Sequence, residues 1–204
     1  MSTSNKPYHH GDLRKTLLEV ADQLIDEGDA GAFSLREVAR RAGVSPPATY
    51  RHFGDKQALL AAVAQKGFED FGRALSEAIG AADDPLAAMG QAYVRFAVAR
   101  PGRFRLMYGP VIVERGRHPE LQAAWIAASE AMRAALLARS PSASDAAVTS
   151  LTLWCMVHGL SQLILDGMLP GHDPDVLARA ITSEFELENP SHASMGFSNA
   201  GRYT

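Results

Sequence analysis

Apolar residues recur at spacings of three and four along most of the chain, which is the pattern of amphipathic helices. The first such run begins at Leu13, ends at Leu24 and follows Asp12, a favourable residue for a helix N-cap. Glycine and proline residues separate the later runs. The pattern predicts an all-α protein of about nine helices, at residues 12–27, 34–42, 45–53, 55–80, 84–100, 101–108, 119–138, 145–168 and 174–185.

A short helix, a glycine turn and a second short helix follow one another between residues 34 and 53. Ser34-Leu35-Arg36-Glu37 has the form of a capping box, Gly43 interrupts the helix, and Ser45-Pro46 starts the next one. A tight turn of this kind sets two helices at a steep angle, so that the second can enter a DNA major groove. The alternative interpretation is a pair of helices that pack into the core and leave their arginines in solvent.

Charge and composition agree with a local contact to nucleic acid in a helical protein. The chain of 204 residues has a net charge of −3, yet residues 34–56 carry five basic and two acidic side chains. A basic segment in an acidic chain is typical of a DNA contact. Alanine and leucine together number 55, whereas valine and isoleucine number 17, and this balance favours helix over sheet.

Other classes of protein are excluded or disfavoured. The single cysteine, Cys155, excludes an internal disulfide and a zinc site made of cysteines alone. Residues 1–12 lack the apolar segment of a signal peptide, and the uncharged run 146–165 holds too many polar residues for a membrane span. Paired carboxylates, a Ser-His-Asp constellation and a glycine-rich phosphate loop are all missing, which argues against an enzyme. We expect a cytoplasmic protein without a metal ion, a cofactor or a membrane partner.

The second short helix contains side chains suited to phosphates and to bases. Pro46 and Pro47 occupy its first two positions, where backbone N–H groups have no helical partner, so the prolines do not break it. They offer apolar surface to thymine methyl groups. We expect Ser45 to cap this helix at the Ala48 N–H. The phosphate contacts are expected mainly from Tyr50, His52 and Lys56.

The segment as a whole resembles the DNA-binding domain of the tetracycline-repressor (TetR) family of bacterial regulators. The resemblance covers about residues 13–71 and rests on SLREVA at 34–39, AGVS at 42–45, YRHF at 50–53 and DKQALL at 55–60. Thr49 departs from it, because the family usually carries a larger aliphatic residue there. The resemblance implies a homodimer that represses a promoter from a palindromic operator. It places at the DNA Arg36, Ser45, Pro46, Pro47, Tyr50, Arg51, His52 and Lys56.

The C-terminal part, with RPGRFRLM at 100–107 and WCMVHGL at 154–160, resembles the ligand-binding half of the TetR subgroup that carries Trp-His-Gly. Aromatic and methionine positions there suggest a mostly apolar pocket, with Tyr93, Tyr108 or His158 as its polar anchor. The alternatives are a plain apolar core and a histidine held by a buried hydrogen bond. The expected lining residues are Phe71, Tyr93, Phe96, Phe104, Met107, Tyr108, Trp125, Trp154 and His158.

The helix predicted at 145–168 is apolar on nearly all sides, so both of its sides need to be covered. We expect the side with Leu151, Trp154 and His158 to face the subunit's own core and the other side to meet a second copy of the chain. A core helix of a single chain is the alternative. The expected dimer contacts are Leu153, Leu160, Leu163, Ile164, Leu177, Ile181 and Phe185.

These expectations divide the chain into a helix-turn-helix domain at 12–71, a ligand-binding and dimerisation domain at 72–188 and a flexible tail at 189–204. The function that follows is a dimeric repressor that a small, mostly apolar molecule releases from its operator. The competing class is a helical module that binds a ligand or a protein partner and does not bind DNA.

Overall fold

The computed structural model describes residues 10–28, 33–109, 115–139 and 146–183. Within these ranges the chain forms nine α-helices, a short 3-10 helix and no β-strand, which confirms the all-α prediction. The first helices are α1 (His10–Asp26), α2 (Leu35–Arg41), α3 (Pro46–Tyr50) and α4 (Lys56–Gly80). The later elements are α5 (Pro85–Ala99), α6 (Pro101–Tyr108), η2 (Arg115–Arg117), α7 (Pro119–Arg139), α8 (Ala146–Leu165) and α9 (Pro174–Ser183).

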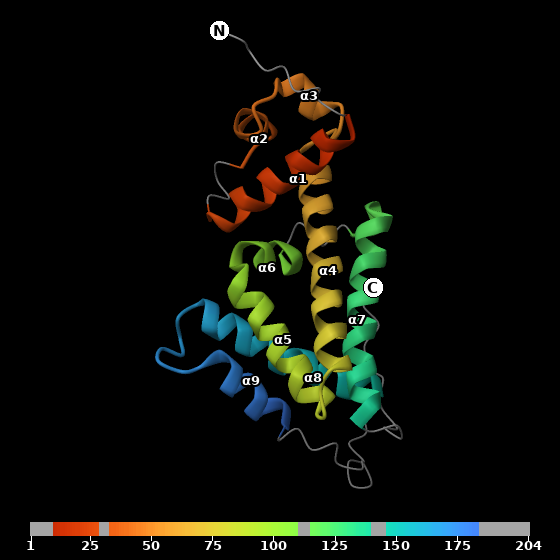
Figure 1. Ribbon diagram of the computed structural model, residues 1–204, viewed down its shortest axis with the longest axis vertical. Helices are drawn as coiled ribbons and strands as arrows, with labels where there is room; N and C mark the ends of the chain where they lie inside the picture. Colours follow the sequence, from red (N-terminus) through yellow and green to blue (C-terminus); the bar gives the residue numbers. More distant parts are fainter. Residues whose placement is uncertain (1–9, 29–32, 110–114, 140–145, 184–204) are drawn as a thin grey trace, which may run out of the picture.

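Two groups of helices share one long helix. Helices α1 to α3 form a head at one end of the molecule, and α5 to α9 form a body around the rest of α4 (Figure 1). Helix α7 runs along α4, and α6 lies where the body meets α1. Helix α4 therefore belongs to the head and to the body.

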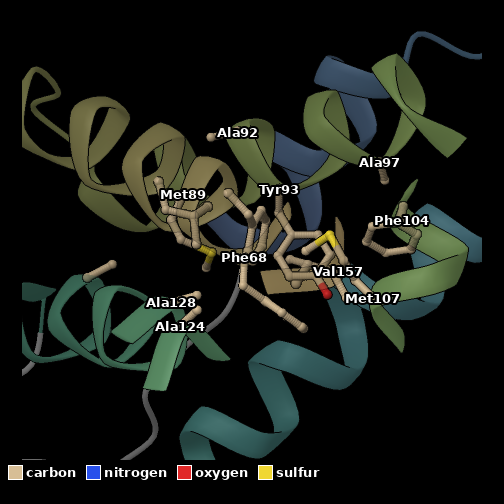
Figure 2. Packing of buried hydrophobic residues seen from close by; sticks show 14 of the residues in the cluster. Phe68, Met89, Ala92, Tyr93, Ala97, Phe104, Met107, Ala124, Ala128 and Val157 are labelled. Carbon is tan, nitrogen blue, oxygen red and sulfur yellow. The ribbon is translucent and has the colours of Figure 1, made fainter. Parts of the chain in front are cut away.

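Each group has its own hydrophobic core. In the head, Leu17 of α1, Val38 of α2 and Leu59 of α4 pack together with Phe53. The body core collects buried side chains from five helices, α4 to α8 (Figure 2). Among its members are Phe68, Met89, Tyr93, Phe104, Met107, Ala128 and Val157.

Three of the residues predicted as N-caps cap their helix with the side chain. Ser34 Oγ accepts the backbone N–H of Glu37 at 3.1 Å. Asp55 Oδ1 accepts the N–H of Ala58 at 2.7 Å, and Asp84 caps α5 in the same way. Such bonds satisfy N–H groups that have no partner within the helix, so they define where each helix begins.

Two other helix starts differ from the prediction. Helix α1 begins at His10, two residues before Asp12, because an acidic residue is favourable both at a cap and in the first turn and does not fix the boundary. Ser45 precedes α3 as expected, but its side chain makes no capping bond, and the Ala48 N–H bonds to the Ser45 carbonyl at 2.9 Å. The Ser45 hydroxyl is therefore left for other partners.

The expected domain boundary after residue 71 falls inside α4, which continues through Phe71 without a break. The expected arm before residue 10 and the expected tail at 189–204 lie outside the described residues. The last two residues of the helix expected at 174–185 lie outside them as well.

Thr49 gives a test of the packing in the head. Its side chain is fully buried, and its hydroxyl has no hydrogen-bond partner among the described residues. Because valine has the same shape without the hydroxyl, Thr49→Val should raise the free energy of unfolding by about 1 kcal/mol. We expect the melting temperature in calorimetry to rise by about 2–4 °C.

Thr182 provides the matched control, because it is equally buried but donates a hydrogen bond to the Ala178 carbonyl at 2.7 Å. Thr182→Val removes that bond and should not stabilise the protein. A melting temperature that falls equally in both variants would contradict the assignment for Thr49.

Candidate DNA-binding surface and ligand cavity

Helices α2 and α3 are joined by a turn that glycine makes most easily. Gly43 has a φ of +69°, in the left-handed region that other residues seldom adopt. Just after it, the Val44 N–H bonds to the Ala39 carbonyl at 3.0 Å. The turn therefore sets α3 in a defined position against α2.

Helix α3 turns one side to the head core and the other to solvent. Thr49 and Phe53 are buried, whereas Tyr50 is 49% exposed. Seven of the eight residues expected at DNA lie within α2, α3 and the segments that flank them, and Lys56 is the first residue of α4. Of the eight, seven are exposed, namely Arg36, Ser45, Pro46, Pro47, Tyr50, Arg51 and Lys56, and His52 is half-buried.

Two of the basic residues in this segment are held by carboxylates. Arg40 pairs with Glu37 at 2.7 Å, and Arg41 pairs with Glu37 at 3.2 Å and with Glu27 at 2.6 Å. Hydrogen bonds from Arg40, together with those from Arg41, lower the pKa of Glu37 to about 2. The Glu37 carboxylate is thus used by the arginines, so it does not complete the expected capping box.

The remaining basic side chains are exposed. Arg36, Arg51 and Lys56 make no ion pair within the part of the chain that the structure describes. Arg14 of α1 joins them, since its guanidinium lies 5.2 Å from the centre of the Phe53 ring. The sequence interpretation missed Arg14, because that contact joins residues almost forty positions apart. These four cations form the charged part of the candidate DNA surface.

A cavity of about 240 Å³ lies in the body between α4, α6, α7 and α8. Four of the nine residues expected to line a pocket do so: Phe71, Tyr108, Trp125 and Trp154. The sequence interpretation missed the others, Phe68, Ala128, Ser129, Met132, Arg133, Ser150, Leu151 and Leu153. Helical spacing was the available signal, since Ser129 and Met132 follow Trp125 by four and seven residues and Ser150 precedes Trp154 by four.

Beside the cavity, Tyr93 links two side chains of α8. Its hydroxyl accepts the indole N–H of Trp154 at 3.1 Å and lies 3.0 Å from Nδ1 of His158 (Figure 2 shows Tyr93 in the core). Burial raises the pKa of Tyr93 and lowers that of His158, so the phenol and the imidazole are both neutral at pH 7. Tyr93 is fully buried and engaged, so it is not a free ligand anchor, which corrects the expectation. His158 has the buried hydrogen bond of the alternative interpretation.

The other expected pocket residues belong to the surrounding core. Phe104 and Met107 are fully buried and do not line the cavity. Phe96 packs on Phe71 with ring centres 5.0 Å apart. The pattern of aromatic residues therefore marks both the cavity wall and the layer behind it, because a helical face alone does not distinguish the two.

Helix α8 is rotated relative to the expectation. Leu153 is 1% exposed and lines the cavity, so it is not available to a partner, whereas Leu151, expected to face the core, lines the cavity but is 54% exposed. Leu160 is buried, Leu163 is 47% exposed, and Ile164, Leu177 and Ile181 are half-buried. Phe185 lies outside the described residues.

The outward face of α8 is mostly apolar, and α9 adds Val176 beside the exposed Arg179 and Ala180. Val148 and Leu163 of α8 and Val176 of α9 are all exposed, and α8 carries no charged side chain. By length and composition alone, α8 could cross a membrane, and it is the one such helix in the described ranges. A core helix or an interface helix passes the same test.

Two family models match the chain. The model of bacterial regulatory proteins of the tetR family matches residues 17–63, and the model of the tetracyclin repressor-like C-terminal domain matches residues 86–185. The uncharacterized HTH-type transcriptional regulator YobS of Bacillus subtilis (strain 168) is 28% identical over 98 residues. That match covers 46% of this chain and 50% of YobS, so the chain spans about half the length of this curated relative.

Solved structures have the same fold. A protein with unknown function from Rhodococcus sp. RHA1 is 32% identical, with a TM-score of 0.76, over 88% of this chain and 96% of that one. The TetR family regulator PfmR from Thermus thermophilus is 22% identical, with a TM-score of 0.63, over 82% of this chain and 94% of that one.

The two family models fall on the two structural groups described above. One covers most of the helix-turn-helix head with its exposed α3, and the other covers α5 to α9, which supply the cavity wall except for Phe68 and Phe71. Members of this family are regulators rather than enzymes, bind DNA through the head and respond to ligands. This chain belongs to the tetR family of bacterial transcriptional regulators.

Proposed function

We propose that this regulator is a dimeric repressor in the cytoplasm that leaves a palindromic operator when a small, mostly apolar molecule fills the cavity. The observation that carries the proposal is the continuity of α4. One end of α4 lies beside the exposed α3 and its exposed cations, and further along Phe68 and Phe71 of α4 form part of the cavity wall. Ligand binding then favours a separation of the two heads that no longer matches successive major grooves, which are about 34–36 Å apart.

At the DNA, α3 occupies the major groove. Tyr50, Arg51 and His52 lie on or beside its exposed side, and Pro46 and Pro47 stand at its tip. The free hydroxyl of Ser45 is suited to a phosphate, as are the side chains of Arg36 and Lys56. Arg14 adds a phosphate contact from α1.

The apolar face of α8 and α9 is covered by a second copy of the chain. Leu163, Ile164, Leu177 and Ile181 lie on or beside it, and the exposed Val148 and Val176 extend it. Two antiparallel pairs of such helices form a four-helix interface that buries this face on both subunits.

Helix α6 gives the cavity a second connection to the head. Tyr108 near its C-terminal end lines the cavity, while at its N-terminal end a Cβ on Gly102 would lie only 2.1 Å from the Ile25 carbonyl of α1. Arg103 holds Asp22 of α1 and, at 3.0 Å, Asp70 of α4. A ligand that displaces Tyr108 therefore moves α6 against α1.

Substitutions in the head should separate base contacts from phosphate contacts. Arg51→Ala should weaken operator binding by about 1–3 kcal/mol and relax the preference for the operator sequence. Lys56→Ala should weaken binding to all DNA sequences alike and reduce the slope of log affinity against log salt concentration by about one. Arg40→Ala is the control, since Arg40 is already paired with Glu37. Fluorescence anisotropy with DNA from upstream of the gene measures the affinity of each variant. An affinity that does not depend on salt concentration would contradict the assignment of Lys56 to a phosphate.

Gly102→Ala should disturb the contact between α6 and α1. The added methyl group cannot fit against the Ile25 carbonyl, so the helices must separate, and operator affinity should change without any change in α3. Gly80→Ala is the control, because a Cβ there meets nothing within 4 Å. Equal operator affinity in both folded variants would show that α6 does not couple to the head.

Leu163→Arg should prevent dimer formation, because it places an unpaired charge in the apolar interface. Light scattering at micromolar concentration should then give the mass of one chain, 21.9 kDa. Ile126→Arg on α7 changes a similarly exposed residue outside α8 and α9 and should leave the dimer intact. A wild-type protein that is monomeric at this concentration would refute the interface.

A further inference from the structure

The cavity described above has an unusual wall for its size. Five aromatic rings line it, from Phe68 and Phe71 of α4, Tyr108 of α6, Trp125 of α7 and Trp154 of α8. At about 240 Å³ it lies just below the range of pockets for drug-sized ligands. Such a wall fits a flat, apolar group of one or two rings, because aromatic rings pack well edge-to-face or offset-stacked.

Each polar side chain of the described lining carries a hydrogen-bond donor, and the serine and tyrosine hydroxyls can also accept. Arg133 is its one charged residue among the described lining residues, and no carboxylate belongs to it. The Nε–H of Arg133 donates a hydrogen bond to Oε2 of Glu130 at 2.8 Å, and the side chains of this ion pair are both about half exposed. Such an exposed pair is worth little, so the other N–H groups of Arg133 can turn to a ligand.

Ser150 supplies a second donor. Its Oγ is buried and has no hydrogen-bond partner among the described residues, although the side chain belongs to the cavity wall. A buried hydroxyl without a partner is unfavourable, and rotation about χ1 alone redirects it. The other serine of the wall, Ser129, already donates to the Trp125 carbonyl at 2.9 Å. Tyr93 already occupies the Trp154 N–H, so the indole has no donor left for a ligand.

We propose that the effector of this regulator is an aromatic carboxylate of one or two rings. Its ring lies among Phe71, Trp125 and Trp154, and its carboxylate accepts hydrogen bonds from Arg133 and Ser150. A carboxylate gains a charge-assisted hydrogen bond from Arg133 that a neutral amide does not gain, and an organic cation finds no opposite charge among the described lining residues. This inference rests on the proposed function for its regulatory meaning, but binding can be measured without DNA.

The protein contains its own reporter, since both of its tryptophans, Trp125 and Trp154, line the cavity. The full chain is titrated with 3-phenylpropanoate, 3-phenylpropanamide and 3-phenylpropylammonium, which share one ring and differ in the charge of the end group. Tryptophan emission is followed with excitation at a wavelength where these probes do not absorb. We expect the carboxylate to bind about tenfold tighter than the amide, as for a charge-assisted hydrogen bond, and the ammonium to bind weakest.

Two pairs of variants assign the preference to the named donors. Arg133→Gln should remove the tenfold preference and leave amide binding unchanged, whereas Arg73→Gln, which removes an i,i+3 pair with Asp70 outside the cavity wall, should change neither. Ser150→Ala should weaken carboxylate binding several-fold, and Ser129→Ala should not.

Three results would overturn the proposal: no change in emission with any probe at millimolar concentration, tightest binding of the ammonium, or a preference for the carboxylate that survives Arg133→Gln. Operator binding is measured on the same samples without probes. If it is intact while the carboxylate preference is lacking, this inference alone fails. If operator binding is lacking while the preference is present, the proposed function fails and the ligand class stands.

Discussion

Helix α4 packs into two hydrophobic cores along one unbroken helix. Leu59 and Val63 pack into the head, and Phe68, Phe71 and Leu75 pack into the body, along a helix of 25 residues. A helix of this kind has no hinge between the two cores, because each residue is hydrogen-bonded to the next turn. A change in packing around Phe71 is therefore expected to reach the head as a whole rather than a single loop.

The contact of α6 with α1 limits how the head can move. At Gly102 the two backbones approach so closely that no side chain fits between them. Next to this contact, Arg103 is buried and joins Asp22 of α1 to Asp70 of α4. Ion pairs with little solvent exposure are costly to break one partner at a time, so the three helices are expected to shift together.

Some polar side chains of the body make their hydrogen bonds within the core, and others still have a donor to offer to a ligand. Tyr93 and His158 bond within the core, and Trp154 both joins them and lines the cavity. Ser150 and Arg133, by contrast, still have hydrogen-bonding capacity on the cavity side. A ligand packed on Trp154 thus contacts the side chain that connects α8 to Tyr93 of α5, in addition to the two donors.

The sequence by itself determined the local structure and the family, because caps, turns and helical periodicity depend on residues a few positions apart. Asp55 caps α4 and Gly43 makes the turn where the pattern predicted them. Only the tertiary structure decided how α8 is rotated, so that Leu153 faces the cavity, and that Arg14 stands beside α3. It also decided that the Ser150 hydroxyl has no hydrogen-bond partner among the described residues. An almost uniformly apolar helix has no preferred face of its own, so its orientation is set by the helices that pack against it.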